Sequence, residues 1–180
     1  MDEHRIFMHV AMEEALEAKV AGEVPVGAVV VVDGEVVGRG HNASLALSDP
    51  TAHAEVLALR AAASRLGNFR LVGATLYCTV EPCLMCLGAV MHARIAHVVC
   101  GAPDLKVGAL DRIDVLRASG ADFNHRFEVT RGVLGNEASE LLLDFFRERR
   151  AAARALQMDS EYGEVPKWSY RGRLESALSP

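Results

Sequence analysis

The stretch from residue 74 to residue 101 constrains the fold most, because it reads as strand, helix and strand with short connections. Ala74–Val80 and Ile95–Gly101 are apolar runs of strand length, and Pro82 lies between them where a helix can begin. Two strands of one sheet that are joined through a helix run parallel, and such crossovers are right-handed. We therefore expect a sheet that contains a parallel pair and is covered by helices.

The segments upstream add helices and a hairpin. Residues 4–20 place apolar side chains at helical spacing opposite acidic ones, which predicts an amphipathic helix. Asp33-Gly34 between two valine-rich runs predicts a two-residue hairpin turn. Asp49 is expected to cap a second helix that has Pro50 at its first position and ends near Leu66.

The segments downstream complete the expected fold. Phe127–Thr130 reads as a short strand, and Asn136 is expected to cap a long helix. The sum is a three-layer α/β/α domain with a mixed central sheet. Because the helical pattern fades after residue 156, we expect one domain over residues 1–156 and a C-terminal tail over residues 157–180.

Three metal-ligand side chains and one carboxylate lie at the starts of the two central helices. His53 and Glu55 belong to an H-A-E motif, and Cys83 and Cys86 to P-C-L-M-C. Cysteines three apart at a helix start share one face, and the helix dipole favours their thiolate forms. Structural zinc sites normally have four protein ligands, whereas catalytic sites keep one position open. Three ligands and a separate Glu therefore predict a catalytic zinc site, in the pattern of the zinc nucleobase deaminases.

Hydrolytic deamination is the chemistry expected of such a site. Zinc lowers the pKa of a bound water towards about 7, and Glu55 would pass the released proton to a ring nitrogen and to the departing ammonia. A structural zinc knuckle is the alternative, and the helix-start position of both motifs argues against it. Positions 53 and 55 are about 200° apart on an ideal helix, so the end of the helix, not one face, must converge on the metal.

These residues and several further segments resemble the bacterial tRNA-specific adenosine deaminases, within the cytidine deaminase-like superfamily. The segments that carry the resemblance are Glu23–Ala28, Gly40–Asn42, Asp49–Glu55, Ala74–Tyr77, Glu81–Cys86, Gly101–Lys106, Asn124–Arg126 and Asp144–Arg147. The resemblance covers most of the chain. It implies a homodimer that converts adenosine to inosine at the first anticodon position of an arginine tRNA.

The resemblance also assigns roles to residues of this chain. His53, Cys83 and Cys86 would hold one zinc ion, and Glu55 would move protons. Asn42 would read the base, consistent with the pairing of an amide with adenine, and the alternative is an ordinary loop amide. The expected contacts to the tRNA anticodon loop are Asp104, Lys106, Asn124, His125, Phe145 and Arg149.

Four features depart from the pattern of the family. Pro103 stands where the family usually has Arg, and Val107 where it has a small or polar residue. His41 occupies a common Trp position, and Leu110–Arg112 replaces a longer Gly/Ser-rich turn. These changes lie near the expected RNA-contacting loop, so they bear on substrate length and sequence context and leave the chemistry intact.

Two other functions compete with tRNA deamination. One is deamination of a free base or nucleoside, such as guanine or cytidine, on the same fold. The other is an inactive binding subunit that keeps zinc for folding. Asn42, the pair Asp104 and Lys106, and the helix that carries Phe145-Phe146-Arg147 together favour RNA over a small molecule. The presence of Glu55 argues against an inactive subunit.

Charge and hydropathy limit the kinds of partner that the chain can bind. The net charge is −5, which is not typical of a nucleic-acid binder. A cluster of Arg147, Arg149, Arg150 and Arg154 could still bind phosphates locally, or form a solvated helix face. No apolar run approaches the roughly 20 residues of a membrane span, and acidic residues within positions 1–20 interrupt any signal peptide. We expect a cytoplasmic protein with no membrane partner.

Overall fold

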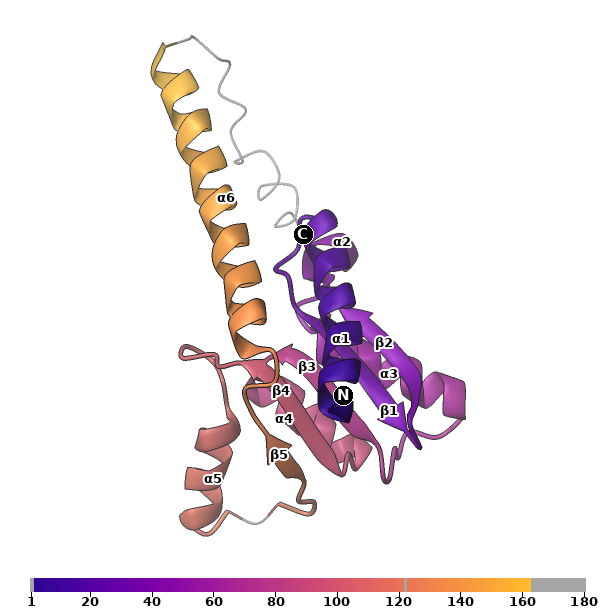
Figure 1. Ribbon diagram of the computed structural model, residues 1–180. Coiled ribbons are helices and arrows are strands. Elements are labelled where there is room, and N and C mark those ends of the chain that lie inside the picture. The colour runs from indigo at the N-terminus through magenta and orange to yellow at the C-terminus, as the bar shows by residue number, and fades with distance from the viewer. Residues whose placement is uncertain (1, 122, 163–180) are drawn as a thin grey trace, which may run out of the picture. The chain divides into compact units, whose positions relative to one another are not determined.

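The structure is a computed structural model that describes residues 2–121 and 123–162. The chain divides into two compact units, Met1–Phe145 and Phe146–Pro180, which are described separately. The helices are α1 (Glu3–Val20), α2 (Ser44–Leu47), α3 (Ala54–Leu66), α4 (Leu84–Ala93), α5 (Leu110–Ala118) and α6 (Gly135–Tyr162), and the strands are β1 (Gly27–Val32), β2 (Glu35–His41), β3 (Thr75–Val80), β4 (His97–Ala102) and β5 (Glu128–Thr130) (Figure 1).

The strands form one mixed sheet in the order β2-β1-β3-β4-β5. Strand β1 is antiparallel to both β2 and β3, whereas β3, β4 and β5 run parallel. The predicted parallel pair is therefore confirmed. The predicted hairpin is confirmed as well, because Val32 pairs with Glu35 and the two turn residues Asp33 and Gly34 have φ values of 49° and 77°.

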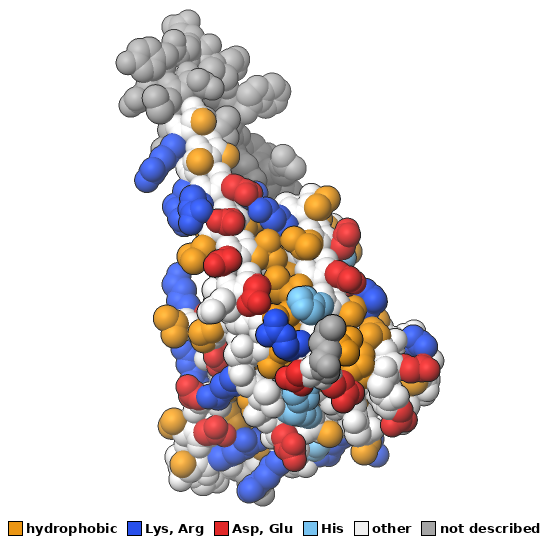
Figure 2. Space-filling model, in the orientation of Figure 1, with side chains coloured by type: hydrophobic (Ala, Val, Ile, Leu, Met, Phe, Trp, Pro, Cys, Tyr) orange, Lys and Arg blue, Asp and Glu red, His pale blue; other side chains and the backbone are white. Residues whose placement is uncertain are grey.

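Helices cover both faces of the sheet. Helix α1 lies on one face, and α3 and α4 lie on the other (Figure 1). Successive side chains of β3 point to opposite faces of the sheet and so pack in different cores. Tyr77 belongs to the core beneath α1, whereas Leu76 and Cys78 belong to the core beneath α3 and α4. The predicted three-layer fold is confirmed. On the α1 side, acidic and basic side chains are interspersed (Figure 2).

Two glycines of β2 set the position of α3. A Cβ atom at Gly38 would lie 2.4 Å from the Ala58 carbonyl oxygen, and one at Gly40 would lie 2.6 Å from that of Ala54. The helix backbone therefore rests directly on the strand, with no side chain between them. This contact fixes the N-terminal end of α3, where His53 lies.

Two expectations about helix boundaries need correction. The second helix begins at Ala54 and not at Pro50, because the Asp49 carboxylate accepts hydrogen bonds from the backbone N–H and the hydroxyl of Thr51, both at 2.7 Å. Asp49 therefore stabilises a turn that precedes the helix. Helix α6 continues to Tyr162, past the point at residue 156 where its sequence pattern fades.

The expected division between a domain over residues 1–156 and a tail over residues 157–180 falls inside α6 and stays a prediction. Residues 163–180 lie outside the described part of the chain. Among the described residues, no helix has both the length and the apolar character needed to cross a membrane.

Candidate active site

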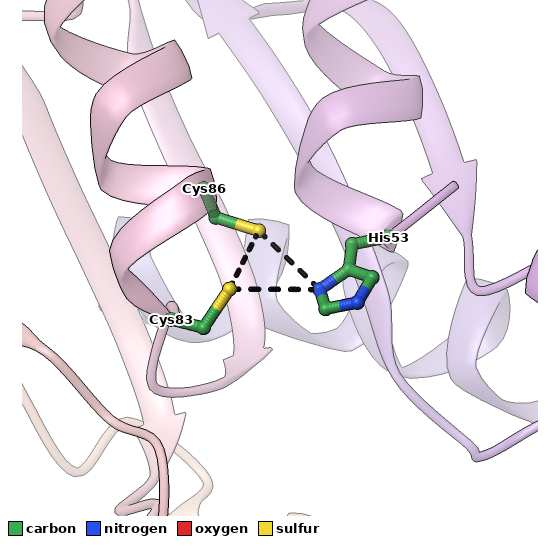
Figure 3. Close-up of side chains that lie close together, drawn as sticks. All are labelled: His53, Cys83 and Cys86. Atoms are coloured by element: carbon green, nitrogen blue, oxygen red, sulfur yellow. Dashed lines mark hydrogen bonds between the residues drawn. The ribbon is translucent and has the colours of Figure 1, made fainter. Parts of the chain in front are cut away.

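The N-termini of α3 and α4 bring the three expected metal ligands together (Figure 3). His53 is the N-cap residue of α3 and Cys83 that of α4, and both have extended backbones outside the helices they precede. Cys86 lies in the first turn of α4 and is fully buried. Because His53 is not helical, the 200° separation expected between positions 53 and 55 does not arise.

The spacing of the donor atoms fits zinc. The His53 Nδ1 atom lies 3.7 Å from Cys83 Sγ and 3.5 Å from Cys86 Sγ, and the two sulfurs are 3.5 Å apart. Zn–S bonds of about 2.3 Å and Zn–N bonds of about 2.0 Å in tetrahedral geometry place ligand atoms about 3.5–3.8 Å from one another. One nitrogen and two sulfurs at these separations are therefore arranged as zinc requires, with a fourth position left for a non-protein ligand.

The protonation of the cluster also suits a metal. Hydrogen bonds from Cys86 and His53 lower the pKa of the Cys83 thiol to about 4. The hydrogen bond to Cys83 and burial raise the pKa of Cys86, and the hydrogen bond with Cys83 raises that of His53. One thiolate is thus present at neutral pH, stabilised by two neighbouring protons that a cation would replace.

Glu55 lies in the first turn of α3, and its side chain is only 4% exposed. Burial raises the pKa of its carboxyl above the ordinary value of 4.5, and contact with His53 and Cys86 opposes that shift. A carboxyl whose pKa is raised towards neutrality can both accept and release a proton, which is what a general acid–base needs.

A pocket of about 240 Å³ opens beside the cluster. Its walls combine valines with a few polar groups, as is typical of small-molecule and nucleobase sites. The lining residues are Val24, Val26, Asn42, His53, Glu55, Val80, Glu81, Cys83, Asp104 and Val107. Of the residues expected to recognise substrate, Asn42 and Asp104 therefore lie at the pocket.

Asn42 has a structural bond as well as a place in the pocket. Its Oδ1 atom accepts a hydrogen bond of 2.9 Å from the backbone N–H of Ala54, the first residue of α3. His53, the N-cap residue, makes no side-chain capping bond, so Asn42 takes over that role. The Asn42 amide, which also carries two N–H donors, lies at the pocket.

The loop after β4 forms the opposite wall. The Asp104 carboxylate accepts from the backbone N–H groups of Lys106 and Val107 at 2.9 and 3.0 Å. Glu81 accepts from the N–H of Leu110 at 3.1 Å. A Cβ atom at Gly108 would lie 2.7 Å from the Glu81 carboxyl carbon, so only glycine fits between loop and carboxylate. The wall is therefore held by two carboxylates.

Two of the remaining expected contacts, Asn124 and His125, lie away from this pocket. Asn124 and His125 lie at the far end of α4: Arg94, its C-cap, donates to the Asn124 carbonyl, and His125 Nε2 donates to the Ile95 carbonyl at 2.6 Å. A helix of ten residues is about 15 Å long, which separates them from Cys83.

The three other residues that were expected to contact the anticodon loop differ in their exposure and in the unit to which they belong. Lys106 is exposed on the loop beside the pocket. Phe145 is only 6% exposed, so its ring is buried. Arg149 belongs to the second unit, and its relation to the pocket stays a prediction.

Sequence reasoning gave no role to Glu81, although it lines the pocket and holds the loop. Its position in the sequence could have indicated a role, because it is a charged residue directly after an apolar strand. Ligands commonly bind at the carboxyl ends of parallel strands.

Comparison with known proteins extends beyond the motif. The family model for the zinc-binding region of cytidine and deoxycytidylate deaminases matches residues 1–102. The tRNA-specific adenosine deaminase of Haemophilus influenzae is 48% identical over 145 residues, covering 79% of this chain and 83% of that protein. The similarity to the tRNA-specific adenosine deaminase is therefore longer than the match to the family model, and it includes residues after 102.

Solved structures give the same picture. A structure from a study of A-to-I editing by tRNA:A34 deaminases at the wobble position of transfer RNA matches with a TM-score of 0.71 and 43% identity, over 76% of this chain and 98% of that one. A guanine deaminase from Nitrosomonas europaea matches with a TM-score of 0.64 and 26% identity, over 78% and 83%. Both the fold and the zinc-binding region are thus shared with enzymes that deaminate purines.

Proposed function

We propose that this chain, which belongs to the family of tRNA-specific adenosine deaminases, converts adenosine to inosine at the first anticodon position of tRNA by hydrolytic deamination. The observation that carries the proposal is the convergence of His53, Cys83 and Cys86, with the buried Glu55 beside them, at a pocket wide enough to admit a base. As a finer part of the proposal, the substrate is an arginine tRNA and the enzyme acts in the cytoplasm.

We assign the three donor side chains to one zinc ion. His53 would supply its Nδ1 atom, and Cys83 and Cys86 would supply thiolates. When bound, zinc lowers the pKa of water so that a nucleophile is available at neutral pH. The protein contributes the fixed donor geometry, because both helix ends that carry the ligands are anchored in the core.

Glu55 carries the protons in this proposal. Hydrolysis replaces the exocyclic amine of adenine with oxygen from water, so one proton must reach a ring nitrogen and another the departing ammonia. The buried Glu55 carboxyl, with its raised pKa, can take each proton from water and pass it to the base. Asn42 would donate its amide N–H to an acceptor of the purine, because its oxygen is bonded to Ala54.

The substrate favoured is a base in an RNA loop. A stacked base cannot reach a buried metal site, whereas an unpaired loop base can be turned into a pocket. Asp104 at the pocket and the exposed Lys106 beside it would meet the neighbouring nucleotides. The tRNA:A34 deaminase structure, with a TM-score of 0.71 and 43% identity, is also more similar to this chain than the guanine deaminases from Nitrosomonas europaea and Bacillus subtilis, with TM-scores of 0.64 and 0.53 and identities of 26% and 39%, which supports the same choice.

The proposal includes a homodimer. Helix α4 carries apolar side chains on its outer surface next to the ligands: Leu84 is 55% exposed and Met85 is 37% exposed. An exposed apolar patch beside a site is typical of an interface. Replacing Leu84 with Glu, which a first helical turn tolerates, should yield monomers in analytical ultracentrifugation if this surface pairs two chains. A dimer that persists would assign the interface elsewhere.

A substrate panel tests the function. The wild-type chain is incubated with an arginine tRNA anticodon stem-loop, with a stem-loop that has another anticodon beginning in adenosine, and with free guanine and cytidine. Sequencing reads inosine as guanosine, and ammonia release reports the small molecules. Inosine at the first anticodon position, lost in Glu55→Ala, is the expected result. Activity on guanine or cytidine alone would overturn the substrate while keeping the zinc chemistry.

A further inference from the structure

Glu23 is a buried carboxylate that the chemistry above does not use. Its side chain is 3% exposed, and its backbone N–H donates to the Ala18 carbonyl at 2.9 Å, which attaches it to the end of α1. One carboxylate oxygen, Oε1, accepts from the backbone N–H groups of Leu45 and Ala46 at 2.7 and 2.8 Å. A buried charge is costly unless it is hydrogen-bonded, and these two bonds are of the short, charge-assisted kind.

Helix α2 donates these two bonds from its first turn. It is four residues long, none of its side chains is buried, and its N-cap residue Ala43 makes no side-chain capping bond. Leu45 and Leu47 are 68% and 58% exposed. Helices this short are unstable on their own. The Glu23 carboxylate therefore supplies the N-terminal cap that Ala43 cannot provide.

The segment tied down by Glu23 carries the base-reading residue. The Asn42 backbone N–H donates to the Val26 carbonyl at 3.1 Å, and its side chain accepts from Ala54 at 2.9 Å. Val24 and Val26, which follow Glu23, line the pocket together with Asn42. Val24, Val26 and Asn42 thus form one wall of the pocket. The residues that follow Asn42 are held by the Ala43 N–H, which donates to the Ala52 carbonyl at 3.0 Å, and by Glu23.

We propose that Glu23 is a positioning residue for base recognition, which acts through Asn42 by holding α2 and the pocket wall in place. This inference rests on the proposed function, because it assumes that Asn42 contacts the target base. It assigns Glu23 no contact with the substrate. Loss of the carboxylate should let the wall move, so that the base is held less well while the metal ligands stay in place.

A double-mutant cycle on the full-length chain tests the inference. Glu23→Ala should lower kcat/KM on the anticodon stem-loop by about tenfold to a hundredfold, the scale of lost hydrogen bonds to a charged group, mainly through KM. Glu23→Gln, which keeps an acceptor oxygen, should recover part of that loss. The double variant Glu23→Ala with Asn42→Ala should be no worse than Asn42→Ala alone. Multiplying effects would overturn the inference, because they would show that Glu23 acts independently of Asn42.

Two controls separate this result from misfolding. Zinc content should remain at one ion per chain in every variant, and Glu17→Ala, an exposed position on α1, should leave kcat/KM unchanged. If Glu23→Ala lost zinc, Glu23 would be a general folding residue and the inference would fail.

Amide hydrogen exchange gives a readout that needs no activity. The N–H groups of Leu45 and Ala46 should exchange slowly in the wild type and at least about tenfold faster in Glu23→Ala, since their acceptor is gone. Should the wild type deaminate no RNA, the proposed function would fail, and this exchange difference would still decide whether Glu23 holds the wall. Unchanged exchange would overturn the inference in either case.

Discussion

The two sides of the pocket are built in different ways. On the metal side, donor atoms project from the ends of α3 and α4, which rest on the sheet and bury Cys86 and Glu55. On the other side, the segment of Asn42 and the loop of Asp104 are irregular, and each is held by hydrogen bonds to a carboxylate, from Glu23 or from Glu81. In the proposed function, the chemistry lies on packed helix ends and the recognition of the base on tethered loops.

This difference predicts separable defects. Changes on the metal side should remove the chemical step and leave RNA binding, whereas changes in the loops should weaken binding and leave zinc in place. Variants on each side of the pocket test that separation.

Glu55→Ala should have the largest effect. Loss of the proton carrier should lower kcat by at least about a thousandfold, within the range for a general acid–base. Zinc content, measured by atomic absorption, should stay near one ion per chain, because His53, Cys83 and Cys86 are untouched. If activity and zinc were lost together, Glu55 would be acting as a ligand, and the division between ligands and proton carrier would be wrong.

Gly108→Ala should damage the loop side. The new methyl group would lie 2.4 Å from the Asp104 carbonyl oxygen and 2.7 Å from the Glu81 carboxyl carbon, so the loop must shift. We expect kcat/KM to fall by about tenfold or more, through KM, on the scale of one or two lost polar contacts. Gly88→Ala is the matched control, since a Cβ at Gly88 meets no atom within 4 Å. Equal behaviour of the two variants would contradict the close fit at Gly108.

Replacing Arg149 and Arg150 together with Ala should have a smaller, salt-dependent effect. If both contact phosphates, RNA affinity should fall severalfold at low salt, and the slope of log K against log salt should become shallower by about 1.4, since each contact with single-stranded RNA contributes about 0.7. Filter binding over a range of salt concentrations measures the slope. An unchanged slope would remove this part of α6 from the RNA-contacting surface.

The smallest effect is expected on folding stability. It concerns the free energy of unfolding of the metal-free protein in the variant Glu55→Gln. Burial raises the pKa of Glu55 above 4.5, so the folded chain keeps a proton that the unfolded chain releases. The metal-free wild type must therefore lose stability as pH rises from 4.5 through the raised pKa. The variant has no carboxyl at this position, so its stability does not fall in this way. After removal of the metal by a chelator, urea unfolding should give the variant a higher free energy of unfolding than the wild type at neutral pH. This difference should shrink towards pH 4.5. A gain that is independent of pH would contradict the burial of this charge.

Local patterns were sufficient to predict the metal side. The Asp33-Gly34 turn, the parallel β3 and β4 strands and the three donor residues were predicted because each depends on neighbours in sequence. The predicted helix start at Asp49 was wrong for a physical reason. A capping carboxylate stabilises a turn as readily as a helix, and here the three residues that follow lead to the extended His53.

The loop side could not be predicted in the same way. Helices α2 and α5 were missed, because each donates a backbone hydrogen bond to a carboxylate that is distant in sequence: Leu45 donates to Glu23, and Leu110 to Glu81. The far position of Asn124 also depends on a contact across 30 residues, from Arg94. Such pairings follow from the completed fold and leave no periodic trace in the sequence.

The backbone contact between β2 and α3 has a consequence for genetics. Neither Gly38 nor Gly40 touches the pocket, yet a side chain at either position would push on the helix backbone at 2.4 to 2.6 Å and shift the end that carries His53. In a deep mutational scan selected for tRNA editing, these two positions should be as intolerant as the metal ligands. If the fitness scores of such a scan were interpreted without the structure, these two glycines would be taken for residues that contact RNA.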